Sequence, residues 1–376
     1  MRPRPDYFPW LDPLRAFAAL SVLAFHLVVL ADLPIPTWYP VAWFRIGLFG
    51  VDLFFAISGA VILFSLAELE RRHGTGLRRA FAWRRAARIV PLYLLTGTAF
   101  ILLAKPDILL RADVVQVVIA HLFFVQNLFA STHGVINGPS WTLAVEMQFY
   151  LVVLLAGPWL LRLRMRTLAL VGLLIGLGWR AGVWWWLVRD AASSDTNLVF
   201  IASTQLPGVF DEFVAGMLAV RWVVQRREQG RVPGLATAAW LAFAALVAWS
   251  GAILWMHQHL DDFWSHPASV IGLRSVLALA VGLSVAAALS LPAPSRPIAG
   301  LRLSGDLSYG IYLWHMGVLL VMLGAWPDAP PWRFGLAVLA GTLLVSALSW
   351  RFFERPILRW ARSREATVER LPPPAD

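Results

Sequence analysis

The chain has 376 residues, of which 59% are hydrophobic and 14% charged, with a formal net charge of +10. Soluble domains carry about 45–50% apolar and about 25% charged residues, so this composition excludes an ordinary soluble protein and predicts that lipid surrounds most of the chain. The absence of cysteine excludes disulfides, thiolate nucleophiles and zinc–thiolate sites, and the arginines are spread between apolar segments, which argues against nucleic acid as a partner.

Apolar segments of the length that a bilayer requires, about 20 residues, recur along the whole chain. No internal repeat and no soluble domain interrupts them, so residues 1–356 are expected to form one membrane domain. Residues 357–376 are expected to be a short, disordered, polar tail in the cytoplasm. The eleven candidate segments are 14–33, 46–66, 89–104, 113–130, 139–161, 167–187, 206–224, 234–255, 268–291, 307–325 and 333–352.

The arginines between these segments predict the topology, because cytoplasmic loops are enriched in Arg and Lys. The rule places both termini in the cytoplasm, which requires an even number of crossings. Eleven segments cannot satisfy this requirement. The extra segment lies between the arginine-rich loops at 71–88 and 162–166, where only two of three candidate segments can cross. We expect 113–130, which contains several polar side chains, to be re-entrant or interfacial, with 89–104 as the alternative. The predicted fold is an all-α, polytopic membrane helix bundle of about ten transmembrane helices plus this segment.

The first two segments carry ionisable side chains that need a function or a partner. Arg15 and His26 are eleven residues apart, which returns to within about 20° of the same helix face, about 16 Å further along the axis. Arg15 would mark the cytoplasmic mouth and His26 the bilayer interior; alternatively, a backbone carbonyl simply satisfies His26. Asp52 lies about two turns inside the second segment and needs a partner such as His26 or an arginine.

Further candidates follow along the chain. Arg85 and Arg88 share a helical face at i, i+3, where guanidinium groups could hold the phosphates of a cytoplasmic donor or only anchor the loop. Glu146 lies within a span, where a carboxylate indicates either catalysis or an ion pair between helices. Tyr312 and His315 belong to a polar line along 307–325. Together the buried histidines and carboxylates favour a reaction site or an ion path.

Six motifs in chain order resemble acyltransferase family three, a family of integral membrane O-acyltransferases, and the resemblance extends over residues 11–356. It departs at Met147, where the family often has a second carboxylate. The motifs are Leu11-Asp12-Pro13-Leu14-Arg15-Ala16 with His26, Gly50-Val51-Asp52-Leu53-Phe54-Phe55-Ala56-Ile57-Ser58-Gly59, Arg85-x-x-Arg88-Ile89-x-Pro91-x-Tyr93, Ser140-Trp141-Thr142-Leu143-Ala144-Val145-Glu146-x-Gln148-Phe149-Tyr150, Ser308-Tyr309-x-x-Tyr312-Leu313-x-His315 and Phe353-Glu354-Arg355-Pro356.

The resemblance implies about ten membrane helices and an acyl transfer reaction. The donor would be cytoplasmic acyl-CoA, with acetyl-CoA expected, and the acceptor a hydroxyl of a sugar or glycolipid, in lipopolysaccharide or another cell-surface polysaccharide. No metal is expected. The resemblance places the chain in the inner membrane of a bacterium, where its partners are membrane lipids and the acceptor, and leaves its oligomeric state open.

This chemistry requires a base, stabilisation of the thioester oxyanion and a binding site for phosphates. We assign His26 as general base or acyl relay. Arg15, Arg85 and Arg88 are the expected phosphate contacts. Of these assignments, His26 with Arg15 is the strongest.

The remaining candidates have supporting roles. Asp52 or Glu146 would orient an imidazole, and Tyr309 or His315 could donate to the oxyanion or the acceptor. The alternative function is a proton-coupled secondary transporter or a polysaccharide exporter. The lack of paired Gly/Pro-broken helices in two matching halves argues against a transporter.

Overall fold

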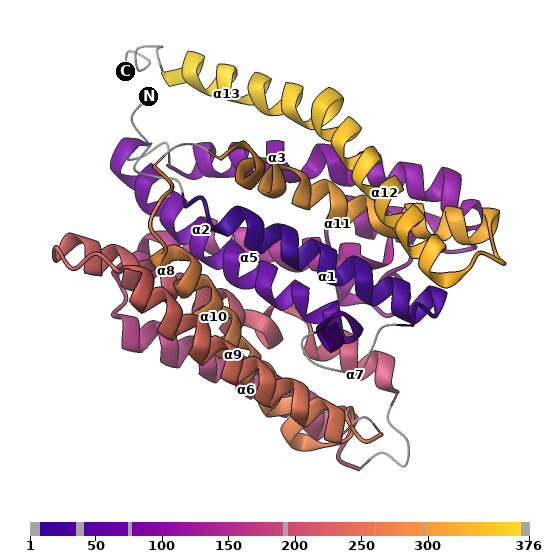
Figure 1. Ribbon diagram of the computed structural model, residues 1–376, viewed down its shortest axis with the longest axis horizontal. Helices are drawn as coiled ribbons and strands as arrows, with labels where there is room; N and C mark the ends of the chain where they lie inside the picture. Colours follow the sequence, from indigo (N-terminus) through magenta and orange to yellow (C-terminus); the bar gives the residue numbers. More distant parts are fainter. Residues whose placement is uncertain are drawn as a thin grey trace.

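A computed structural model describes residues 8–34, 41–73, 77–190, 195–259, 261–295 and 298–369, and within these ranges the chain is helical and contains no strand (Figure 1). This confirms the predicted all-α class. The α-helices are α1 (Leu11–Ala31), α2 (Gly50–His73), α3 (Leu77–Ala99), α4 (Val114–Leu122), α5 (Trp141–Arg162), α6 (Met165–Leu187), α7 (Thr196–Ser203), α8 (Phe210–Glu228), α9 (Leu235–Gln258), α10 (Arg274–Ser290), α11 (Ala299–Ala325), α12 (Pro331–Ser349) and α13 (Arg355–Glu369).

Nine helices in the described ranges are long and apolar enough to cross a membrane. Helices α7 and α8, bent by 72° at the break between them, can supply a tenth span. The expected number of about ten is therefore confirmed. Residues 113–130 do not provide a full span, because α4 extends for only about 14 Å before the chain turns. Residues 89–104, the alternative, belong to the continuous helical stretch Arg78–Ala104.

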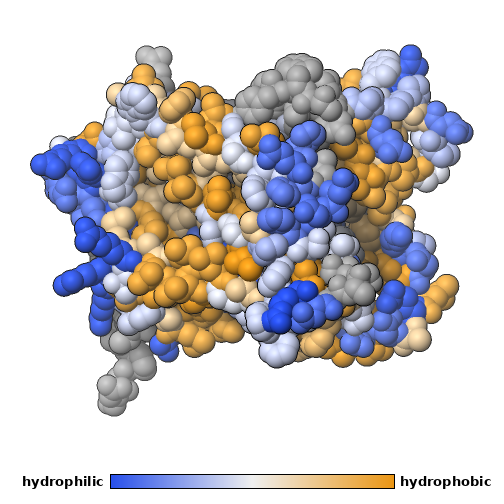
Figure 2. Space-filling view, turned by 90° about the horizontal axis from the view of Figure 1, so that it is seen from below, coloured by the Kyte–Doolittle hydropathy of each residue, from blue (hydrophilic) through white to orange (hydrophobic). Residues whose placement is uncertain are grey.

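The outer surface has the character of a membrane protein. Figure 2 shows hydrophobic residues over a broad part of one face, with hydrophilic residues gathered at its left end and in patches on the right. Large apolar side chains such as Trp240, Leu174 and Leu344 are at least 60% exposed. A soluble protein rarely exposes contiguous apolar surface on this scale, so these side chains face lipid.

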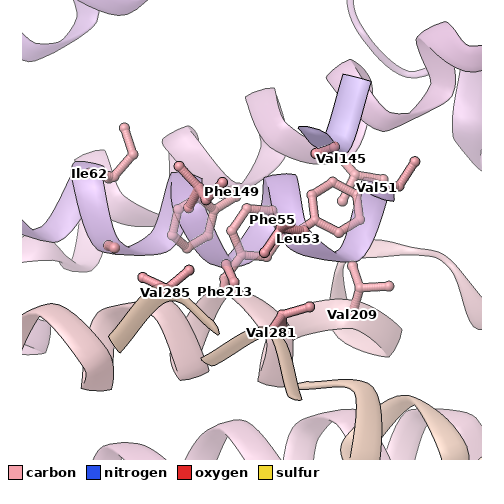
Figure 3. Packing of buried hydrophobic residues seen from close by; sticks show 14 of the residues in the cluster. Val51, Leu53, Phe55, Ile62, Val145, Phe149, Val209, Phe213, Val281 and Val285 are labelled. Carbon is pink, nitrogen blue, oxygen red and sulfur yellow. The ribbon is translucent and has the colours of Figure 1, made fainter. Parts of the chain in front are cut away.

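Helix α2 forms the centre of the bundle, and 72% of its most apolar stretch is buried. It packs against α8 through stacked aromatic rings (Figure 3). The ring of Phe213 lies 4.8 Å from that of Phe55 and 4.0 Å from that of Phe149, centroid to centroid. Offset aromatic pairs of this kind contribute about 0.5–1.5 kcal/mol beyond the area that they bury.

Two glycines let α2 and α8 approach at backbone distance. A Cβ atom added to Gly216 would collide with the carbonyl oxygen of Ala56, and one added to Gly59 would collide with that of Phe213. Small residues at membrane-helix interfaces permit this close approach. Gly59 and Gly216 therefore serve helix packing.

The segment after the last span differs from its expected disorder. Residues 355–369 form α13, which lies alongside α3 at the edge of the bundle (Figure 1). The indole of Trp83 donates to the carbonyl of Ala361 over 3.1 Å, and Ala361 is buried. Pro356 does not prevent this helix, because proline is tolerated in the first helical turn. The end of the predicted tail, 370–376, lies outside the described residues.

We predict that Gly216→Ala lowers the stability of the bundle by about 1–3 kcal/mol, since the added methyl group overpacks the contact between α2 and α8. The measurement is the thermal unfolding midpoint of the purified protein in detergent. Gly251→Ala is the matched control, because nothing lies within 4 Å of the Cβ added there. An equal effect of both substitutions would show that helix propensity, not interhelical contact, governs these positions.

Candidate active site

A pair of histidines joins α1 to α11. The Nδ1 atom of His26 lies 3.2 Å from the Nε2 atom of His315, and the ring centroids are 5.1 Å apart. His315 is buried, whereas His26 remains half-buried. The two helices meet closely at their N-terminal turns, where Gly305 contacts Asp12 and a Cβ would not fit. That approach brings together two histidines that are 289 residues apart in the sequence.

The backbone contacts of the two imidazoles determine where their protons lie. The Nδ1 atom of His315 is 3.2 Å from the carbonyl oxygen of Ile311, and that of His26 is 2.9 Å from the carbonyl oxygen of Val22. A carbonyl only accepts, so both Nδ1 atoms carry hydrogen. The single hydrogen on Nδ1 of His26 is then shared between the carbonyl oxygen of Val22 and the lone pair of His315 Nε2. This arrangement leaves Nε2 of His26 unprotonated and available as a base.

Three arginines form a cationic cluster with Arg15 at its centre. Arg15 lies within electrostatic range of Arg85, Arg88 and Glu146, so the predicted grouping is present. The side chain of Arg15 is 27% exposed, and its NH1 atom lies 3.1 Å from Asp12 Oδ1. The charge of Arg15 is therefore partly compensated within the first turn of α1.

Aromatic rings contact Arg85 and Arg88 of α3. The guanidinium of Arg85 lies 5.8 Å from the ring of Tyr150, and that of Arg88 lies 5.5 Å from the ring of Tyr309. The NH2 atom of Arg85 donates to Ser65 over 3.3 Å, while its buried Nε atom has no partner. Cation–π contact fixes the position of a guanidinium without using its N–H groups. The Nε atom of Arg85 therefore keeps an unused donor inside the cluster.

Glu146 belongs to this cluster but does not contact an imidazole. Its Oε1 atom accepts hydrogen bonds of 2.5 Å from both Ser58 and Tyr150. The predicted role of orienting a histidine is therefore replaced by a network with two hydroxyl groups. Ser58 of α2 is thus a hydrogen-bond partner of this carboxylate.

Asp52 belongs to a different network, and the suggestion that it orients an imidazole is wrong. Its Oδ1 atom lies 2.9 Å from the NH1 atom of Arg274, which is also 2.9 Å from Oε1 of Glu212. Two partners were expected for Asp52, His26 or an arginine, and the structure shows an arginine. A second pair, Arg180 with Asp211, is nearby, because Asp211 is within electrostatic range of Asp52.

The two tyrosines of α11 are bound to backbone carbonyls. Tyr309 donates to Ile89 over 2.8 Å, and Tyr312 donates to Pro139 over 2.9 Å. Tyr312 also exchanges a 2.8 Å hydrogen bond with Thr142. Donation by Tyr309 to an oxyanion, one of the predicted roles, would require its hydroxyl to leave Ile89.

A polar network fills the segment that does not span. Gln205 donates to the backbone of Asn127 over 2.5 Å, Asn127 accepts from Gln148 over 2.8 Å, and Gln126 donates to the hydroxyl of Tyr93 over 3.1 Å. Because lipid satisfies no backbone or amide group, irregular chain at this depth must be paired by protein. The polar side chains that marked 113–130 in the sequence serve this purpose.

Sequence reasoning missed two buried arginines, although their position in apolar segments was a signal. Arg180 and Arg274 each lie inside an apolar segment, where an arginine is costly unless it is paired. The Arg180 guanidinium is fully buried and bidentate to Asp211 at 2.8 and 3.1 Å. Either arginine alone would have indicated a buried ion pair, but not which carboxylate completes it.

Comparison with known proteins shows which family the chain belongs to. The model of the acyltransferase domain family matches residues 8–351. The chain belongs to this family. It is similar to the peptidoglycan O-acetyltransferase OatA of Listeria monocytogenes, with 28% identity over 380 residues, covering 93% of this chain and 56% of that protein. The exopolysaccharide production protein ExoZ of Rhizobium meliloti is 33% identical over 335 residues, covering 86% of this chain and 94% of that protein.

A further relative is the putative peptidoglycan O-acetyltransferase YrhL of Bacillus subtilis, which is 27% identical over 379 residues, covering 93% of this chain and 55% of that protein. The chain thus spans about half the length of OatA and YrhL. No solved structure shows a significant match. With its candidate spans, the chain is a multi-pass membrane protein of this family.

We predict that Arg274→Gln destabilises the protein by about 3–5 kcal/mol, because it leaves the carboxylates of Asp52 and Glu212 without their buried cation. Adding Asp52→Asn should restore part of the loss, and thermal unfolding of the single and double variants measures this coupling. Arg189→Gln, which removes an exposed pair with Asp190, is the control and should change stability by less than about 1 kcal/mol. Strictly additive losses would contradict the pairing of Asp52 with Arg274.

Proposed function

We propose that the protein transfers an acyl group, acetyl in the first instance, from cytoplasmic acyl-CoA to a hydroxyl of a sugar in a cell-surface polysaccharide or glycolipid. The observation that carries this proposal is the unprotonated Nε2 of His26 on the same helix as Arg15, which lies within range of Arg85 and Arg88. A base for an alcohol and a cationic site for a phosphorylated donor are the two requirements of the reaction.

In this mechanism His26 acts as a general base. Its Nε2 atom takes the proton of the acceptor hydroxyl as the oxygen attacks the thioester carbonyl. A C–O bond forms, the C–S bond breaks, and the leaving thiolate of coenzyme A takes the proton back from the imidazolium. The half-exposed position of His26 gives the acceptor access to it.

His315 positions the base. By accepting from Nδ1 of His26, it fixes the ring and stabilises the imidazolium that forms during transfer, as the third member of a catalytic triad does. The partly exposed guanidinium groups of Arg15 and Arg88, which lie 3.1 Å from Asp12 and 3.8 Å from Glu354, bind the phosphates of the donor together with Arg85. No carboxylate is needed in direct contact with His26.

The acceptor class is supported by the relatives. Two are named for O-acetylation of peptidoglycan and one for production of an exopolysaccharide, so a sugar polymer or its lipid-linked precursor is the proposed acceptor. A bacterial inner membrane with both termini in the cytoplasm is the proposed location. The arginine cluster would then face the compartment that contains acyl-CoA.

We predict that His26→Gln inserts and folds normally but lowers acyl transfer by about 10²–10⁴-fold, because glutamine cannot accept the proton. Transfer of radiolabel from acetyl-CoA to glycan in purified membranes is the measurement. His257→Gln, at an exposed position of α9, is the matched control and should retain activity. Near-normal activity of His26→Gln would remove the assignment, and uptake of a substrate without covalent labelling by the unmodified chain would indicate a carrier.

A further inference from the structure

A cavity of about 540 Å³ lies between the N-terminal turns of α11 and helix α13. This volume falls within the range of about 300–1,000 Å³ that is usual for small-molecule sites. The cavity has an unusually basic lining for its size. The charged residues that line it are Arg302, Asp306, Arg355, Arg359 and Arg362.

The positive charge of this lining is not compensated locally. In the described part of the chain, no ion pair with a carboxylate involves Arg302, Arg355, Arg359 or Arg362. The one carboxylate of the lining, Asp306, is within electrostatic range of Arg302 and Arg362. Four guanidinium groups around one carboxylate leave a surplus of positive charge. Such a cavity favours a ligand with more than one phosphate, because planar guanidinium groups bind phosphate oxygens bidentately.

The cavity adjoins the arginine cluster of the active site. Trp350 is half-buried, lines the cavity and lies 5.7 Å from the guanidinium of Arg88, which in turn lies 5.5 Å from the ring of Tyr309. The cavity therefore lies next to Arg88 of the cluster, and α11 leads from the cavity lining to His315. Along α11 the distance from Arg302 to His315 is about 20 Å, which the extended pantetheine arm of coenzyme A can bridge.

We propose that this cavity holds the phosphorylated nucleotide end of the acyl-CoA donor. The guanidinium groups of α11 and α13 bind its phosphates, and Trp350 offers an aromatic face to the adenine. The pantetheine arm passes Arg88 and places the thioester at His26. This inference rests on the proposed function and adds a second, separate phosphate site to the one formed by Arg85 and Arg88.

Helix α13 supplies most of the positive charge of this site. Three of its four arginines, at positions 355, 359 and 362, are spaced four and three residues apart, which places them on one face of the helix. On another face of the helix, the indole of Trp83 donates to the backbone carbonyl of Ala361 and fixes α13 against α3. The cavity thus depends on a segment beyond the last span, and an anionic lipid headgroup is the competing source of phosphate at the same place.

The test uses the purified full chain in an uncharged detergent, with adenosine 3′,5′-bisphosphate as the probe. This molecule carries the nucleotide end of coenzyme A without the thioester. The Arg355→Gln/Arg359→Gln double variant should raise its Kd at least tenfold, as measured by isothermal titration calorimetry. The single variant Arg302→Gln tests the same site from α11 should the double variant unfold. Arg364→Gln is the matched control, because Arg364 lies on α13 outside the cavity lining.

The kinetic arm compares acetyl-CoA with acetyl-pantetheine, which lacks the nucleotide. In the unmodified chain kcat/KM should be at least tenfold higher for acetyl-CoA, and the double variant should lose most of this preference while its rate with acetyl-pantetheine stays the same. Equal Kd and equal preference in the variant and the unmodified chain would overturn the inference. Failure of the proposed function would instead appear in the unmodified chain, as no transfer from either donor.

A lipid arm separates the two sources of phosphate. The same chains are placed in nanodiscs of phosphatidylcholine with or without phosphatidylglycerol. The inference predicts that nucleotide binding depends on the cavity arginines in both membranes. Dependence of phosphatidylglycerol binding on these arginines, with nucleotide binding unchanged, would assign the cavity to a lipid headgroup and overturn it.

Discussion

The contact between His26 and His315 is the interaction on which the candidate site depends, because it fixes the proton positions of both imidazoles and the separation of α1 and α11. Each ring donates from Nδ1 to the carbonyl four residues earlier on its own helix, so neither ring can rotate freely. In a medium without water, such pairing is also what makes a buried histidine tolerable. One geometric arrangement therefore satisfies two polar groups and leaves one lone pair free for chemistry.

The other ionisable groups divide into two sets with different tasks. Arg274 with Asp52 and Glu212, and Arg180 with Asp211, connect α2, α6, α8 and α10 and provide the scaffold. Arg15, Arg85, Arg88 and Glu146 lie on α1, α3 and α5, about 16 Å from His26 along α1. The scaffold guanidinium groups bond carboxylates at 2.8–3.1 Å, whereas in the second set the Nε atom of Arg85 has no partner and Arg88 lies 3.8 Å from Glu354. This difference separates groups that hold helices together from groups that can bind a ligand.

The sequence was sufficient for features that depend on local periodicity. The spans, the shared face of Arg15 and His26 and the pair formed by Arg85 and Arg88 all follow from helical spacing. It was insufficient where the partner comes from a distant helix. Asp52 finds its cation 222 residues away, and Ser58 finds Glu146 88 residues away, so only tertiary packing could assign them. The helix after the last span was missed because its composition is polar overall, although its apolar residues recur at helical spacing.

The central claim, that the thiol end of coenzyme A reaches His26, can be tested directly because the chain contains no cysteine. A single His26→Cys variant is treated with coenzyme A disulfide, and the site of any mixed disulfide is determined by mass spectrometry. Val29→Cys, at an exposed position of α1, is the control. The account predicts an adduct at residue 26 that acetyl-CoA suppresses, and none at residue 29. Adducts that form equally at both positions, or none at residue 26 in a folded variant, would contradict it.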